Sequence, residues 1–144
     1  MVSQTGRPAD DQLDRDVCKL VHQFAQGLDV HVRGVADQLG LTPSQVVALR
    51  ELTEPITARE LAARMFCEPS NVTFVLDRLE QQDLVQRRPH PTDRRAKQIV
   101  LTAEGKRRRG AVLQRLRNHS PLNPLTPDQR QSLCELLQTL VAHQ

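Results

Sequence analysis

Two adjacent arginines, Arg94 and Arg95, have the side-chain chemistry needed to bind a polyanion. An arginine keeps its charge, and its planar guanidinium donates two parallel hydrogen bonds to a phosphate or to a base edge. Asp93 precedes the pair, and a carboxylate one or two residues before an arginine can hold the guanidinium extended, which lowers the entropy lost on binding. The pattern therefore favours recognition of a polyanion.

The residues around the pair predict a β-hairpin with the arginines at its tip. Two β-rich runs, 84–88 and 97–101, flank a turn that contains Pro89 and Pro91. Thr102 then opens a helix. A hairpin tipped with arginines just after an amphipathic helix is typical of a winged helix-turn-helix that binds DNA.

Positive charge is concentrated in the same stretch. Residues 84–109 carry nine Lys and Arg against two carboxylates, a net +7, whereas the rest of the chain carries −4. Such segregation is typical of proteins that bind polyanions, although a solvated basic face gives the same pattern. Within it, the side chains of residues 106–109 point in four directions on a helix. We therefore expect them to form a solvated face, with one or two touching phosphate at most.

Amphipathic helices surround the hairpin. Apolar residues at three- and four-residue steps predict a long first helix within residues 11–40, ending at Gly40. Capping boxes predict short helices at 43–52 and 58–65. A third, at 69–82, follows after a turn of helix-turn-helix length. Two more helices are predicted, at 103–118 and from 127 towards the C-terminus. The fold class is therefore mainly α: an α+β winged helix-turn-helix with about six helices and a sheet of two or three strands.

The helix at 69–82 has the properties of a recognition helix. If Val72, Leu76 and Leu79 face the core, small polar side chains and Phe74 lie on the other faces. Amides and hydroxyls reach base edges, and an aromatic ring can contact thymine methyls. The alternative is a plain surface helix whose Phe74 packs under the hairpin.

Composition places the chain inside the cell. No apolar run approaches the roughly 18–20 residues that span a bilayer, and the N-terminus lacks an apolar signal region. Three widely separated cysteines suit a reducing compartment, so we expect a cytoplasmic protein that does not contact a membrane. The motifs of common enzyme classes are absent, and no enzymatic activity and no cofactor are predicted.

The chain resembles the MarR family of bacterial transcription regulators. The resemblance rests on LTPSQ, ITARELAARM and EPSNVTFVLDRLEQQDLVQRR leading into PTDRRAKQIVLTAEG, and it extends over residues 13–144. The D-R-L-E segment, the D-x-R hairpin tip and the L-T-x-x-G exit occur in the family's order and spacing. Family members mostly repress transcription, often of their own promoter, and release DNA when a small molecule or an oxidant binds.

Three regions are expected within a single domain. Residues 1–10 are polar, with Gly6 and Pro8, and this composition predicts a disordered N-terminus. The resemblance implies that 41–118 form the DNA-binding region, and that the helices of 11–40 and 119–144 interlock in a homodimer that reads a palindrome in double-stranded DNA. The residues implied to contact DNA are Ser70, Asn71, Thr73, Phe74, Arg78, Arg94 and Arg95. Phe74 stands where the family more often has a polar or basic residue.

The resemblance also raises the question of sensing. Cys18 lies where oxidant-sensing relatives carry a reactive cysteine, but the tyrosines that activate it are missing, so a structural cysteine remains the alternative. A small aromatic or anionic effector has His22, His31 and Arg50 as candidate contacts. No histidine or cysteine pair has tight metal-ligand spacing, and no metal site is predicted. The alternative to DNA binding is a winged helix used as a protein-interaction module.

Overall fold

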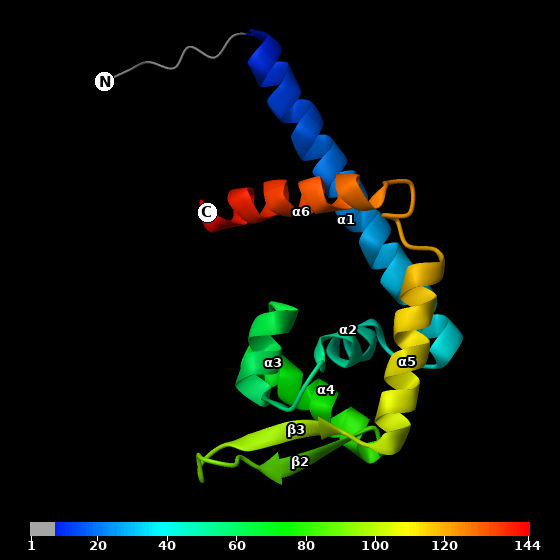
Figure 1. Ribbon diagram of the computed structural model, residues 1–144, viewed down its shortest axis with the longest axis vertical. Coiled ribbons are helices and arrows are strands. Elements are labelled where there is room, and N and C mark those ends of the chain that lie inside the picture. The colour runs from blue at the N-terminus through cyan, green and yellow to red at the C-terminus, as the bar shows by residue number, and fades with distance from the viewer. Residues whose placement is uncertain (1–7) are drawn as a thin grey trace. The chain divides into compact units, whose positions relative to one another are not determined.

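The computed structural model describes residues 8–144, and they form six helices and a three-stranded sheet (Figure 1). The elements are α1 (Pro8–Leu39), α2 (Pro43–Glu51), β1 (Ile56–Thr57), α3 (Ala58–Met65), α4 (Pro69–Gln81), β2 (Val85–Pro89), β3 (Lys97–Leu101), α5 (Ala103–Asn118) and α6 (Pro127–Ala142). The predicted fold class and element order are confirmed. The chain divides into two compact units, residues 32–118 and residues 8–31 with 119–144. No helix in residues 8–144 is long and apolar enough to cross a membrane.

The N-terminal boundary differs from the prediction. Helix α1 begins at Pro8, so the expectation of disorder over residues 1–10 is wrong for its last three residues. Proline is favoured in the first turn of a helix, and Asp10 and Asp11 in that turn interact favourably with the helix dipole. Residues 1–7, to which the rest of that expectation applies, lie outside the described residues. Gly40 ends the helix with a φ of +66°, a conformation that glycine adopts without a steric penalty.

The core of the unit formed by residues 32–118 is aliphatic. Its fully buried side chains include Leu49, Ile56, Leu61, Leu76 and Ile99, from five different elements. The predicted capping box of α2 is confirmed, with Thr42 and Gln45 exchanging backbone and side-chain hydrogen bonds. At the start of α3, only Thr57 contributes a side-chain cap, which accepts the N–H of Glu60. These caps hold two short helices that have little stability of their own.

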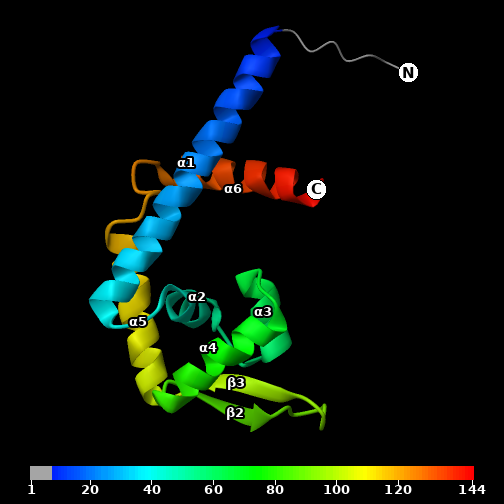
Figure 2. The ribbon, with the colours of Figure 1, turned by 180° about the vertical axis from the view of Figure 1, so that it is seen from behind.

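The sheet has the order β1-β3-β2 and is antiparallel throughout. In the hairpin, Val85 pairs with Leu101 and Pro89 with Lys97. Strand β2 starts one residue later than predicted, because Asp83 adopts a left-handed φ of 58° and the N–H of Leu84 bonds to Leu79 instead of a strand. Figures 1 and 2 show the hairpin extending from α4, with its turn at the end distant from α5.

Helix α5 is anchored to the chain between α4 and β2. The Thr102 hydroxyl donates to the carbonyl of Asp83 at 2.6 Å and accepts the N–H of Gly105 at 2.9 Å. The backbone passes so close here that a Cβ on Gly105 would lie 1.9 Å from the carbonyl oxygen of Leu84. The L-T-x-x-G segment is therefore a joint that fixes the hairpin relative to α5.

Two arginines of α5 have structural roles, which corrects the expectation of a solvated face at residues 106–109. Arg108 donates to the carbonyl of Leu39 at 2.7 Å, and Arg109 donates to those of Leu49 and Arg50 at 2.8 and 3.1 Å. The last carbonyls of a helix lack intrahelical donors, and α5 passes the ends of α1 and α2 where these carbonyls point outward. Both guanidiniums therefore have structural partners within the chain.

Candidate nucleic-acid interface

Helix α4 presents the face that was predicted to recognise bases. Val72, Leu76 and Leu79 are buried, whereas Phe74 is 73% exposed. Phe74 therefore does not pack under the hairpin. The other candidate base contacts on this helix are also exposed: Ser70, Asn71 and Thr73. The hydroxyl of Thr73 donates to the carbonyl of Pro69 at 3.1 Å, so its donor function is already used within the helix.

The hairpin tip is held together by His90 and Asp93. The Nδ1 atom of His90 accepts the backbone N–H groups of Thr92 and Asp93 at 3.2 and 3.1 Å. The Asp93 carboxylate accepts the backbone N–H of Arg95 at 3.0 Å. The predicted role of Asp93 is therefore corrected: its carboxylate fixes the backbone of the turn and does not hold a guanidinium. Among residues 8–144, no ion pair engages Arg94 or Arg95, and both side chains are exposed.

Replacing His90 with Ala is expected to loosen this turn. Two backbone donors lose their common acceptor, and a net hydrogen bond contributes about 0.5–1.5 kcal/mol. The amides of Thr92 and Asp93 should exchange with solvent roughly fivefold faster in NMR hydrogen-exchange measurements. His90→Asn is the matched control, because an asparagine oxygen accepts the same N–H groups in an Asx-turn. Equal exchange rates in H90A and the unaltered protein would contradict the role given to His90.

Arg87 on β2 joins the hairpin to α4, and sequence reasoning missed this contact. Its guanidinium forms ion pairs with Asp77 at 2.8 Å and with Glu80 at 2.7 Å. Although partial burial lowers the pKa of Arg87, the hydrogen bonds to the two carboxylates raise it above its usual value. The contact offsets one of the two negative charges that α4 would otherwise turn towards a polyanion. The signal in the sequence is the three-residue spacing of Asp77 and Glu80, which puts both carboxylates on one side of the helix.

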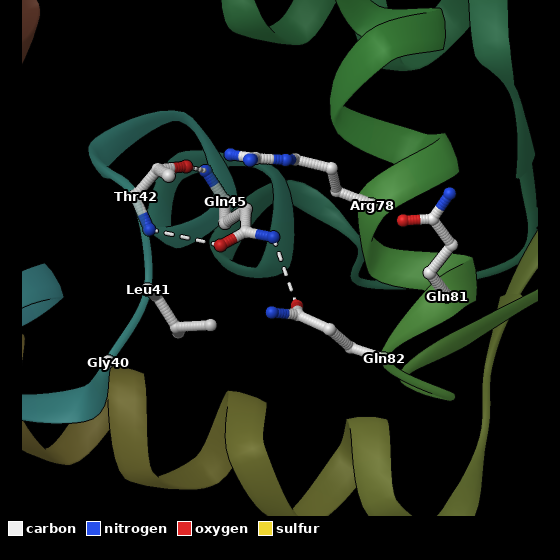
Figure 3. Close-up of a pocket in the computed structure, with 7 residues that line it drawn as sticks. All are labelled: Gly40, Leu41, Thr42, Gln45, Arg78, Gln81 and Gln82. Carbon is white, nitrogen blue, oxygen red and sulfur yellow. Dashed lines mark hydrogen bonds between the residues drawn. The ribbon is translucent and has the colours of Figure 1, made fainter.

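Arg78 lines a polar pocket of about 390 Å³ between the start of α2 and the end of α4. Figure 3 shows its side chain reaching from α4 towards the first turn of α2. Beneath it, the buried side chain of Gln45 accepts the N–H of Thr42 and donates to the side-chain oxygen of Gln82, each at 3.0 Å. This link holds the two helices together, and the pocket offers a cation and amide donors to an anion such as a phosphate.

The structure brings together only some of the candidate sensing residues. Cys18 and His22 line one pocket of about 670 Å³ between α1 and α6, and the His22 ring donates to the carbonyl of Cys18 at 2.8 Å. His31 is half-buried on α1, whereas Arg50 belongs to the other unit and pairs with Glu51. Within residues 8–144, no three His, Cys, Asp or Glu side chains are arranged to hold a metal ion.

Together, α3, the short turn to α4 and the β2–β3 hairpin define a winged helix-turn-helix protein. The model of the MarR family matches residues 41–97, and the chain belongs to this family. Among curated relatives, the transcriptional repressor MdtR of Bacillus subtilis (strain 168) is 34% identical over 97 residues, which is 66% of this chain and 63% of MdtR. The chain thus matches slightly less than two thirds of that relative's length. The regulator TtmR of Methylorubrum extorquens (strain PA1) is 28% identical over 142 residues, covering 97% of this chain and 73% of TtmR.

Solved structures agree with this assignment. A mutant MarR from E. coli complexed with operator DNA superposes with a TM-score of 0.70 at 27% identity, covering 87% of this chain and 93% of that protein. The family and these relatives are transcription regulators, not enzymes. The chain is accordingly a member of the MarR family.

Proposed function

We propose that this protein binds a palindromic operator in double-stranded DNA as a homodimer and represses transcription in the cytoplasm. One observation supports the DNA-binding part above all others. The unit formed by residues 32–118 exposes both the polar start of α4 and the unpaired Arg94 and Arg95, while Arg87 offsets part of the negative charge of α4. One compact unit thus carries both the polar side chains that can contact bases and the arginines that can bind a polyanion.

In the proposed complex, α4 enters the major groove and the hairpin lies over the adjacent minor groove. Ser70, Asn71, Thr73 and Phe74 then face base edges, because they occupy the exposed side of the first two turns of α4. Arg78 contacts the phosphate backbone. Arg94 and Arg95 extend from the fixed turn into the minor groove, where a narrow A·T-rich segment has the most negative potential.

The proposed homodimer interface is formed by α1 and α6. Leu13 and Leu20 on α1, and Leu136, Leu140 and Val141 on α6, are each more than half exposed in the single chain. No residue of α6 is buried. Apolar side chains gathered in this way are typical of surfaces that another protein covers, and the pairing of two DNA-binding units would explain a palindromic operator.

Replacing Leu137 and Val141 together with Glu is expected to dissociate the dimer. Each change places a charge on the apolar face of α6, and burying an unpaired charge costs several kcal/mol. Sedimentation velocity at micromolar concentration should show a monomer. Gln138→Glu adds the same charge to an exposed position of α6 outside this face and should leave the dimer intact. A dimer that survives both Glu substitutions would remove α6 from the interface.

We further propose that binding of an effector causes the protein to release its operator. The pocket lined by Cys18 and His22 has mostly apolar walls, with Val17, Val21 and Leu140 among them, and it suits a small aromatic molecule. An oxidant acting on the exposed Cys18 is the alternative trigger. Either would act on the helices that form the proposed dimer interface.

Selection from a pool of random-sequence DNA duplexes tests the function. The purified protein should enrich an inverted repeat whose half-sites lie about one helical turn, roughly 10 base pairs, apart. Enrichment of a single half-site would contradict the dimeric arrangement. A pool that stays random would contradict sequence-specific DNA binding altogether, and the exposed Phe74 would then point to a protein partner.

A further inference from the structure

The exposed start of α4 is partly apolar, which is unusual for a surface that faces DNA. Phe74 is 73% exposed and lies one turn from Ser70 on the side of the helix opposite the core. A phenyl ring has no hydrogen bond to give to a base. Its most favourable contact in a major groove is with another apolar group, and the C5-methyl of thymine is the apolar group on a base edge there.

The side chains next to Phe74 also favour contact with an A·T base pair. Thr73 uses its hydroxyl hydrogen on the Pro69 carbonyl, so it has no proton to donate to a base, and its methyl adds to the apolar surface. Asp77, one turn beyond Phe74, is held by Arg87 through one carboxylate oxygen, which leaves it fewer ways to accept a hydrogen bond from cytosine. Asn71 has no side-chain partner within residues 8–144, which leaves its amide free for the paired donor and acceptor of adenine.

We propose that Phe74 is a specificity-determining residue that selects a thymine in each half of the operator through its C5-methyl group. Asn71 reads an adenine nearby, so the centre of each half-site consists of A·T pairs. A guanine or cytosine opposite Phe74 is disfavoured because its polar edge finds no partner on a phenyl ring. This inference rests on the proposed function, because it requires α4 to enter the major groove.

Deoxyuridine substitution tests the inference, since it removes only the methyl group of thymine. The probe is the duplex enriched from the random pool, with one thymine at a time replaced symmetrically in both half-sites. Burying one methyl is worth about fourfold in affinity, so one position should weaken binding by about 15-fold when both half-sites are changed. The remaining thymines should each change binding less than twofold.

The Phe74→Ala variant must then lose this discrimination. It should bind the thymine and deoxyuridine duplexes equally, and Phe66→Ala, which removes an exposed phenyl ring at the end of α3, should keep the full difference. Specific binding of the enriched duplex without a sensitive thymine, or a sensitivity that persists in F74A, overturns the inference and leaves the proposed function intact. Failure to enrich any duplex overturns both.

Discussion

The Gly105→Ala variant is expected to unfold about 10 °C below the unaltered protein. The added Cβ would lie 1.9 Å from the Leu84 carbonyl oxygen and 2.9 Å from its carbon, both of them backbone atoms that cannot rotate away. The backbone between α4 and β2 must therefore move, which also strains the hydrogen bonds of Thr102. Overpacking of this kind costs roughly 3 kcal/mol, the upper part of the usual range. Thermal unfolding followed by circular dichroism measures the shift.

Gly110→Ala provides the matched control on the same helix. Nothing lies within 4 Å of a Cβ at Gly110, and alanine is favoured over glycine in a helix by about 1 kcal/mol. This variant should therefore unfold a few degrees higher than the unaltered protein. If both alanine variants shifted the midpoint in the same direction, the close approach at Gly105 would not be the reason for its glycine.

Replacing Arg94 and Arg95 together with Ala is expected to weaken duplex binding by the proposed homodimer about 10,000-fold, because the change removes four arginines from its two subunits. Neither guanidinium has an ion-pair partner in the described residues, so neither change disturbs an internal contact. A contact from a charged donor contributes about 1.5 kcal/mol or more, which is about tenfold for each arginine. Each arginine removed from the DNA surface also releases fewer counterions and lowers the slope of log K against log salt by about one, so the variant homodimer should lose about four.

Arg107→Ala is the control for the loss of positive charge. Arg107 lies on α5, away from the hairpin tip, and its guanidinium forms an ion pair with Glu104. Its removal should change affinity and salt slope little. Losses per arginine that are equal for R107A and for the double variant of Arg94 and Arg95 would mean that overall charge, and not the hairpin tip, determines binding.

Local signals in the sequence were enough to predict the elements. The capping residues Thr42 and Thr126, each followed by proline, located the starts of α2 and α6 because a cap is a contact between near neighbours. The buried face of α4 followed from its helical period, since Val72, Leu76 and Leu79 recur at three- and four-residue steps. The start of α1 at Pro8 was missed, although proline and two aspartates in the first turn were visible signals.

Contacts between distant residues were beyond such reasoning. Arg87 and Arg109 look like any other members of a basic run, and only the fold puts one beside Asp77 and the other at the end of α2. The role of His90 could not be predicted either. Its ring accepts backbone N–H groups of the turn, and the sequence pattern predicts the turn but not its hydrogen bonds. The candidate interface was therefore predicted by its exposed residues, whereas the groups that position them required the structure.

Base recognition by α4 is tested most directly by fluorescence anisotropy of the duplex that lies upstream of the protein's own coding region, taken across a salt series with a scrambled duplex as control. We predict tight binding of one dimer per site, a preference of at least 1,000-fold over the scrambled duplex, and a steep loss of affinity as salt rises. Equal affinity for the two duplexes would contradict the account of α4 as a helix that reads bases.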